Sequence, residues 1–210
     1  MKVIFGASGH AKEIEFLLRL KSGQQNMTPD FFITDAPFTS SGRTPTITEA
    51  DFIRKIKSCS KAVGAYIGIG NSKIRAKIAL KFSDYPLISY PNLITDSVTG
   101  DFGNIELGSG NVLFPAVLMT TDIIIGNHNH FNLNTSISHD CTIGDYNTFS
   151  PGVRIAGGVT IGNHSFFGVG ACVIDKVVIG DDIIVGAGAV VTTDLILAGT
   201  YVGVPAKKIK

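Results

Sequence analysis

The sequence predicts two domains of different architecture, a small α/β domain followed by a three-sided parallel β-solenoid. Strand-like and helix-like segments alternate between residues 3 and 82, an apolar residue recurs at every sixth position from 107 to 191, and 24 of the 210 residues are glycine. So much glycine in a chain that is 44% hydrophobic indicates many turns at regular spacing. We place the two domains at residues 1–88 and 89–210.

The first domain alternates between apolar strand segments and amphipathic helix segments. Strands are expected at residues 3–5, 30–34 and 62–69, and helices at residues 11–21, 49–58 and 72–82. In the first helix, Ile14, Leu17 and Leu18 recur at helical spacing. Alternating strands and helices imply a small parallel sheet, here a Rossmann-like α/β domain.

The second domain shows a six-residue repeat without insertions. Fifteen consecutive steps of six residues carry an apolar side chain, and an Ile-Gly pair followed by Asn or Asp recurs every eighteen residues, at Ile125, Ile143, Ile161 and Ile179. Hexapeptide repeats are typical of parallel β-helices. Three of them form one triangular coil, in which each apolar step points inward and stacks on its equivalent about 4.8 Å along the axis.

The composition excludes several classes of protein. Eighteen Lys and Arg oppose seventeen Asp and Glu, so the net charge of +1 lacks the basic footprint of a general nucleic-acid binder. No apolar run approaches the roughly eighteen residues of a membrane span, and the first residues show no secretory pattern. Cys59, Cys141 and Cys172 follow no disulfide or zinc spacing. We therefore expect a soluble cytoplasmic protein with no membrane span, no metal and no nucleic-acid partner.

The candidate general base is His139, which lies two residues after the inward Ile137 and therefore at a corner of the coil. Imidazole titrates at about pH 6.5, so it can accept a proton at neutral pH, as acetyl transfer from a thioester to an amine requires. The adjacent Asp140 carboxylate can bind the other ring nitrogen and raise the basicity of the ring. From the residues alone, a solvated corner histidine is an equal alternative.

Gly157 and two further histidines are also expected at corners of the coils. Gly157 is expected one coil from His139, where an amide N–H unshielded by a side chain can stabilise an oxyanion, although a plain turn glycine is the alternative. His128 and His164 lie two coils apart on one corner column with Tyr146 between them. A separation of about 10 Å is too large for a shared metal ion, so we interpret these histidines as turn residues.

A glycine loop joins the first strand of the α/β domain to its first helix, through Ser8, Gly9 and His10. Such a loop offers backbone N–H groups and a helix N-terminus to a phosphate, although it is not a complete dinucleotide-binding motif. A tight turn of any α/β sheet is the alternative. Asp35, at the end of the second strand, stands where an acidic residue commonly meets a ribose or a base.

The repeat and three short segments resemble the hexapeptide-repeat sugar acetyltransferases, in the branch that includes the bacillosamine-pathway and sialic acid O-acetyltransferase enzymes. The segments are Phe5-Gly6-Ala7-Ser8-Gly9-His10-Ala11-Lys12, Gly68-Ile69-Gly70-Asn71-Ser72-Lys73-Ile74-Arg75 and Gly203-Val204-Pro205-Ala206-Lys207. The resemblance covers nearly the whole chain.

The resemblance implies a left-handed β-helix, acetyl-CoA as co-substrate, and a homotrimer with active sites between subunits. It matches His139 and Asp140 to the family's general base and its partner, and it places Gly157 opposite the thioester carbonyl. A nucleotide-sugar would bind the first domain at Ser8, Gly9, His10, Asp35, Gly70 and Asn71. Acetyl-CoA would contact Thr148, Gly157, Val169, Gly170 and Lys207, and related sequences often have histidine in place of Thr148.

We therefore expect an acetyl-CoA-dependent N-acetyltransferase that acts by direct attack on the amino group of a nucleotide-linked amino sugar, in particular a 4-amino-dideoxy sugar. Two alternatives stay open. One is O-acetylation of a sialic acid or a related sugar, in which His139 would deprotonate a hydroxyl group. The other is a non-catalytic β-helix that serves as a binding or assembly subunit, which a failure to bind acetyl-CoA would favour.

Overall fold

The computed structural model describes residues 1–21, 28–36, 44–58 and 60–210, so Cys59 lies outside the described residues. The chain forms two compact units, Met1–Leu93 and Ile94–Lys210. Among the residues that the structure describes, no helix is both long and apolar enough to cross a bilayer.

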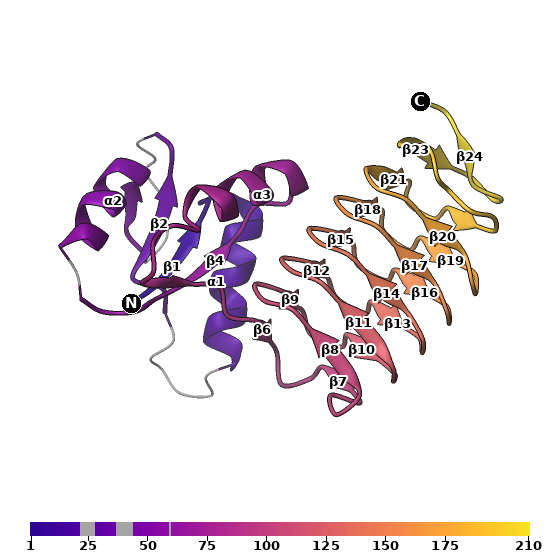
Figure 1. Cartoon of the computed structure of the whole chain (residues 1–210), viewed down its shortest axis with the longest axis horizontal. Coiled ribbons are helices and arrows are strands. Elements are labelled where there is room, and N and C mark those ends of the chain that lie inside the picture. Colours follow the sequence, from indigo (N-terminus) through magenta and orange to yellow (C-terminus); the bar gives the residue numbers. More distant parts are fainter. Residues whose placement is uncertain (22–27, 37–43, 59) are drawn as a thin grey trace. The chain divides into compact units, whose positions relative to one another are not determined.

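Over its described residues, the first unit consists of a five-stranded parallel sheet and three helices (Figure 1). Along the sheet the strands are β3 (Thr46–Thr48), β2 (Phe31–Thr34), β1 (Lys2–Phe5), β4 (Val63–Ile67) and β5 (Ile88–Ser89). The helices are α1 (Gly9–Lys21), α2 (Glu49–Lys57) and α3 (Ser72–Lys81). The predicted strands and helices are confirmed. The edge strands β3 and β5 were not predicted, because two or three residues carry too little pattern to recognise.

The strand order creates a switch point at β1. This strand pairs in parallel with β2 on one side and with β4 on the other. In open α/β sheets, ligands bind beyond the carboxyl ends of the strands at such a point. The rings of Phe5 at the end of β1, Phe52 and Phe82 pack with centroids 4.8–5.8 Å apart, and all three residues are buried. This aromatic cluster holds α2 and the end of α3 against the sheet.

The second unit is a three-sided parallel β-helix (Figure 1). The β6 face consists of β6 (Leu93–Ile94), β9 (Val112–Leu113), β12 (His130–Phe131), β15 (Thr148–Phe149), β18 (Phe166–Phe167), β21 (Ile183–Val185), β23 (Gly199–Val202) and β24 (Lys207–Lys208). The β7 face consists of β7 (Thr99–Gly100), β10 (Leu118–Met119), β13 (Ser136–Ile137), β16 (Arg154–Ile155), β19 (Cys172–Val173) and β22 (Val190–Val191). The β8 face consists of β8 (Ile105–Leu107), β11 (Ile123–Ile125), β14 (Thr142–Ile143), β17 (Thr160–Ile161) and β20 (Val178–Ile179).

The eighteen-residue register predicted from the repeat is confirmed in the middle of the β-helix, where Ile137 pairs with Ile155 and Phe149 with Phe167. The apolar residues at every sixth position from 107 to 191 are buried, except that Leu107, the first of them, is only partly buried. The register changes only toward the two ends of the unit. There Thr99 pairs with Leu118, nineteen residues on, and Ile183 with Gly199, sixteen residues on.

Two side-chain ladders run along one corner of the β-helix. In the first, Asp145 Oδ1 accepts the backbone N–H of Asn127 at 2.6 Å, and Asp181 Oδ1 accepts that of Asn163 at the same distance. In the second, the rings of His128, Tyr146 and His164 stack with centroids 5.1 and 5.2 Å apart, each residue having a φ between 55° and 60°. The interpretation of these histidines as turn residues is confirmed. Within the described ranges, no group of three or more His, Cys, Asp or Glu is arranged to hold a metal ion.

Candidate active site

His139 and Asp140 lie in the turn between β13 and β14, at the corner where the β7 face meets the β8 face. Asp140 has a φ of 59°, and its backbone N–H donates to the carbonyl of Thr121 one coil away. This turn brings the His139 Nδ1 within 2.7 Å of the Asp140 Oδ2. With the proton on Nδ1, the imidazole donates to the carboxylate, and Nε2 is left as a proton acceptor. The side chains of His139 and Asp140 are 62% and 67% exposed, so the pair is accessible to a substrate.

Gly157 lies directly against the His139 ring. A Cβ at Gly157 would come within 2.6 Å of Cε1 and 2.7 Å of Nε2 of the imidazole, so only glycine leaves room for the ring in this position. The neighbouring Gly158 donates its N–H to the His139 carbonyl at 2.8 Å. Among the described residues, the Gly157 amide donates to no acceptor, whereas its carbonyl accepts the N–H of Lys176 at 2.9 Å. The amide is therefore available to a ligand beside the histidine.

The residues that the resemblance assigns to acetyl-CoA are spread over different parts of the β-helix. Thr148 lies on the β6 face, across the core from the corner that carries His139. Val169, 57% exposed, and Gly170, with a φ of 67°, form the turn between the β6 and β7 faces. Lys207 lies in the terminal strand β24 and is exposed. Within one chain, only Gly157 of this group is next to His139.

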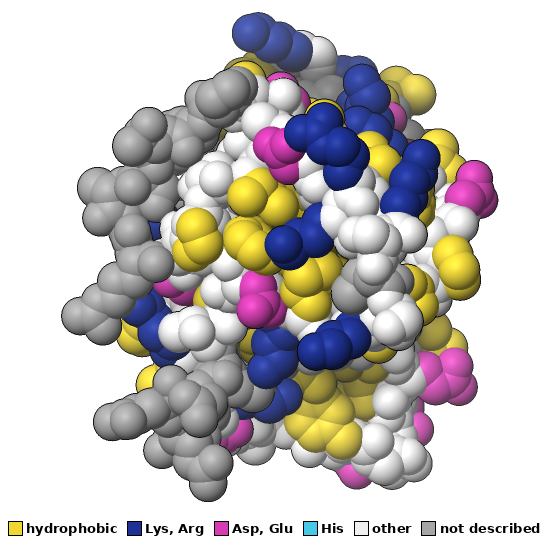
Figure 2. All heavy atoms as spheres, turned by 90° about the vertical axis from the view of Figure 1, so that its left-hand side faces the viewer, with side chains coloured by type: hydrophobic (Ala, Val, Ile, Leu, Met, Phe, Trp, Pro, Cys, Tyr) yellow, Lys and Arg dark blue, Asp and Glu magenta, His cyan; other side chains and the backbone are white. Residues whose placement is uncertain are grey.

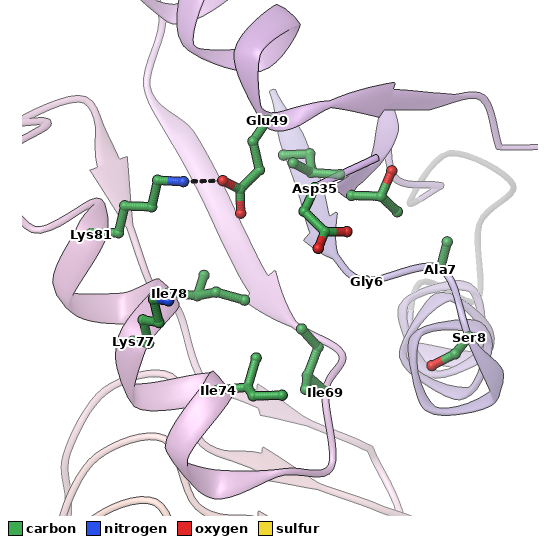
Figure 3. Close-up of a pocket in the computed structure, with 12 residues that line it drawn as sticks. Gly6, Ala7, Ser8, Asp35, Glu49, Ile69, Ile74, Lys77, Ile78 and Lys81 are labelled. Carbon is green, nitrogen blue, oxygen red and sulfur yellow. Dashed lines mark hydrogen bonds and ion pairs between the residues drawn. The ribbon is translucent and has the colours of Figure 1, made fainter. Parts of the chain in front are cut away.

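A pocket of about 500 Å³ opens in the first unit at the carboxyl ends of β1, β2 and β4 (Figure 3). Ser8 and Asp35, both predicted as substrate contacts, line it. Three charged lining residues were missed from the sequence: Glu49 at the start of α2, and Lys77 and Lys81 on α3. No short motif marks these three positions, since α2 and α3 follow strands that are well separated along the chain.

Two glycines bring the loops of this pocket together. Gly6 has a φ of 100°, and a Cβ there would come within 3.0 Å of the Gly68 carbonyl oxygen. A Cβ at Gly68 would lie 2.6 Å from the Ala11 Cα. The loops after β1 and β4 and the first turn of α1 therefore approach one another more closely than any side chain at these positions would permit.

The other four predicted substrate contacts do not line the pocket. The Asn71 Oδ1 accepts the N–H of Ile74 at 3.1 Å, which makes Asn71 the N-cap of α3. His10 Nδ1 lies 3.0 Å from Glu13 Oε2. Burial lowers the pKa of His10, although the hydrogen bond to Glu13 opposes this effect. A Cβ built at Gly9 or at Gly70 would meet no atom within 4 Å.

Arg75 supports the loop after β4 and was also missed. Its side chain is fully buried, and its Nη1 donates to the carbonyls of Ile69 at 2.9 Å and Gly70 at 3.3 Å. The guanidinium N–H groups thus provide hydrogen bonds to two carbonyls of the loop after β4. An arginine one turn after a helix cap was the available signal, but arginines at such positions are usually exposed.

Charged groups of both signs meet at the pocket. Lys81 on α3 forms an ion pair with Glu49 on α2, as the dashed line in Figure 3 marks. On the face shown in Figure 2, basic side chains are interspersed with acidic and apolar ones. The pocket itself combines two carboxylates, from Asp35 and Glu49, with two ammonium groups, from Lys77 and Lys81.

Comparison with known proteins identifies the family. Residues 3–82 match the family model described as the PglD N-terminal domain. A variant of the GDP-perosamine N-acetyl transferase of Caulobacter crescentus, crystallised with CoA and GDP-perosamine, is 31% identical with a TM-score of 0.91, over 100% of this chain and 96% of that one. The chain belongs to the hexapeptide-repeat sugar acetyltransferase family.

Two further solved structures agree. WeeI from Acinetobacter baumannii AYE is 30% identical with a TM-score of 0.87, over 100% of this chain and 99% of that one. The acetyltransferase domain of PglB from Neisseria gonorrhoeae FA1090, in complex with acetyl coenzyme A, is 25% identical with a TM-score of 0.86, over 99% and 98%. No curated protein matches the chain. The family confirms both the predicted left-handed β-helix and the predicted class of enzyme, an acyltransferase.

Proposed function

We propose that this acyltransferase transfers the acetyl group of acetyl-CoA to the amino group of a nucleotide-linked amino sugar, with His139 as general base. The observation that carries the proposal is the His139–Asp140 pair, bonded at 2.7 Å on an accessible corner, with its ring against Gly157. The match along the whole chain to a structure that holds CoA and GDP-perosamine supports it.

The proposed chemistry is a displacement at the thioester carbonyl. The neutral amine attacks the carbonyl carbon, the new C–N bond forms, and Nε2 of His139 accepts the proton that the nitrogen loses. Asp140 stabilises the resulting imidazolium through Nδ1. The C–S bond then breaks, and CoA leaves as a thiolate that recovers the proton from His139. The amide of Gly157 is in a position to donate to the oxyanion of the intermediate.

Direct attack is supported by the state of the cysteine nearest the pair. Cys141 is buried, and its Sγ lies 3.2 Å from the carbonyl oxygen of Ala156, to which the thiol donates. Burial raises the pKa of the Cys141 thiol, which keeps it protonated and a poor nucleophile. A covalent acetyl-cysteine therefore forms no part of the proposed reaction.

The placement of the acetyl-CoA residues supports an active site between subunits. His139 is 62% exposed, and Thr148 lies on the β6 face of the same chain rather than beside it. For both residues to touch one acetyl-CoA molecule, a second subunit must bring its β6 face to the His139 corner. We therefore include a homotrimer in the proposal, with closed threefold symmetry. Light scattering at micromolar concentration tests it, and a mass of one chain would contradict it.

The first unit is proposed to hold the nucleotide part of the sugar substrate. The pocket at the carboxyl ends of β1, β2 and β4 lies at the switch point of the sheet, and Ser8 and Asp35 line it. The loop after β1 also presents the start of α1, whose amide groups suit a phosphate. His10 and Asn71 stay proposed substrate contacts, although each also forms a hydrogen bond at the start of its own helix, to Glu13 and to Ile74.

The test is a panel of nucleotide-linked amino sugars incubated with acetyl-CoA and the full chain, with the product identified by mass spectrometry. We expect N-acetylation of at least one 4-amino sugar and none of its 4-hydroxy analogue. His139→Ala should lower kcat at least about 100-fold. Asp140→Asn should lower kcat less, and Asp122→Asn, which occupies the same corner one coil earlier with a φ of 53°, should leave it unchanged. Full activity of His139→Ala, or acetylation of the hydroxyl sugar alone, would overturn the proposal.

A further inference from the structure

The pocket of the first unit has two opposed sides of different chemistry. Ile69, Ile74 and Ile78 form a mainly apolar side, next to which α3 also carries Lys77. Figure 3 shows Lys81, Glu49 and Asp35 following one another along the other side. An apolar wall beside a polar edge suits a flat heteroaromatic ring, whose faces are apolar and whose rim carries hydrogen-bonding groups. The pocket is thus shaped for a nucleobase, an assignment that rests on the proposed function.

The polar side offers hydrogen-bonding groups in a definite order. The Lys81 ammonium only donates, and the ionised carboxylates of Glu49 and Asp35 only accept. The ion pair between Lys81 and Glu49 holds the donor next to the first acceptor, and Asp35 supplies the second acceptor from the end of β2. The order along the pocket is therefore donor, acceptor, acceptor.

We propose that this order selects guanine. The Watson–Crick edge of guanine carries the O6 acceptor, the N1–H donor and the N2–H₂ donor in sequence, which is the complement of the pocket. In this arrangement Lys81 donates to O6, Glu49 accepts N1–H, and Asp35 accepts N2–H.

The same three groups reject the other bases for separate reasons. Adenine and cytosine place an amino donor followed by a ring-nitrogen acceptor, the reverse of what Lys81 and Glu49 require. Uracil fits Lys81 and Glu49 through O4 and N3–H, but it sets its O2 acceptor against the Asp35 carboxylate. Hypoxanthine matches guanine at O6 and N1–H and offers Asp35 only a C–H. Asp35 is therefore the residue that distinguishes guanine from uracil and hypoxanthine.

The test measures binding of the free nucleoside diphosphates to the full chain by isothermal titration calorimetry. We expect GDP to bind about 10-fold to 100-fold more tightly than UDP, ADP or CDP, and IDP to bind about tenfold more weakly than GDP. Asp35→Ala removes the acceptor opposite N2–H, so it should weaken GDP binding to the level of IDP and remove the difference between the two. Asp84→Ala, at an exposed carboxylate after α3 that does not line the pocket, is the matched control and should keep the preference.

Glu49→Ala provides a second, independent variant, because Ala offers no acceptor to N1–H. It should weaken GDP and IDP binding equally, since Asp35 still distinguishes them. A thermal melt of each variant establishes that it is folded before binding is measured.

The possible outcomes distinguish a failure of guanine selection from a failure of the proposed function, acetylation of a nucleotide-linked amino sugar. Equal affinity for GDP and IDP in the unchanged protein, or tightest binding of UDP or ADP, overturns guanine selection and leaves nucleotide-sugar acetylation intact. Absence of binding by every nucleoside diphosphate overturns both.

Discussion

The two units of this chain build their sites in opposite ways. In the β-helix, His139, Asp140 and Gly157 occupy one corner because each coil repeats the last, so residues eighteen apart are neighbours. In the first unit, the pocket is assembled from loops and helices that no period relates, such as Asp35 after β2 and Lys81 at the end of α3. Periodicity therefore makes one site predictable from spacing, whereas the other depends on the strand order of the sheet.

The difference extends to what stabilises each unit. Every coil of the β-helix contacts chiefly its two neighbours, so its stability is close to a sum of repeated interfaces. The first unit instead depends on single, unrepeated contacts, such as the approach of Gly68 to Ala11 and the buried Arg75 beneath the loop after β4. A substitution should therefore act locally in one unit and on the whole pocket in the other.

The largest effect is expected in the core of the β-helix. Phe131, Phe149 and Phe167 stack with centroids 4.7 and 4.8 Å apart and are fully buried. Phe149→Ala removes the middle ring from both stacks and should lower the free energy of unfolding by about 3–5 kcal/mol, measured in urea. Phe166→Ala, in the next coil but 41% exposed, should cost less than about 1 kcal/mol. Equal losses would contradict the stacked core.

The next effect concerns the close approach that forms the pocket. Gly68→Ala places a Cβ 2.6 Å from the Ala11 Cα, so backbone must move. We expect a loss of about 1–3 kcal/mol in the free energy of unfolding, together with weaker nucleotide binding. Gly70→Ala, two residues on, meets nothing within 4 Å and should keep its stability. If Gly68→Ala bound nucleotide normally, the loop would not depend on this contact.

A smaller effect is expected at the two glycines beside His139, where one substitution displaces the ring of the proposed base and the other strains the backbone. Gly157→Ala keeps an ordinary backbone but displaces the imidazole of His139, so kcat should fall about tenfold or more with little change in stability. Gly158→Ala has the opposite character, because its φ of 69° costs about 1–2 kcal/mol for a residue with a side chain. Steady-state kinetics and thermal melts of both variants distinguish the two roles. A fully active Gly157→Ala would show that the ring does not need this space.

The smallest effect is expected in the polar corner ladder, where Asn and Asp alternate. Asn163 Nδ2 donates to Asp181 Oδ1 at 3.1 Å, and the Asn163 Oδ1 accepts the N–H of Asp145. Asn163→Asp places a third carboxylate between these two and should lower the free energy of unfolding by about 1 kcal/mol, less at high salt.

Asn127→Asp is the graded control for this ladder. It gains only one carboxylate neighbour, Asp145, because Ser109 lies on its other side. It should therefore cost about half as much as Asn163→Asp. Equal losses, or losses independent of salt, would mean that the alternation of Asn and Asp does not limit repulsion.

Much of the fold could be predicted, and for physical reasons. A β-helix must place one apolar residue inward at every sixth position, so its core residues can be identified from the spacing alone. Ile137 and Phe149, for example, are buried as expected. In the first unit, strands and helices long enough to show a pattern were predicted correctly. The short edge strands β3 and β5 were not, since they exist only by pairing with β2 and β4.

The candidate sites, too, combine features that could be predicted from the sequence with features that could not. The corner position of His139 and its closeness to Gly157 follow from counting residues. Its hydrogen bond to Asp140 depends on a turn with a positive φ, which the sequence only permits. In the pocket, Asp35 and Ser8 could be predicted from their places after strands, whereas Glu49, Lys77 and Lys81 could not.

The sequence by itself determined the period of the β-helix, its inward residues and the corner that carries the proposed base, because these depend on contacts repeated at a constant separation. Only the tertiary structure decided which side chains surround the pocket of the first unit. Glu49 and Lys81 are thirty-two residues apart, and their ion pair arises because α2 and α3 both pack against the sheet beside Phe5. Packing of that kind depends on the order of the strands in space, which no local pattern of residues encodes.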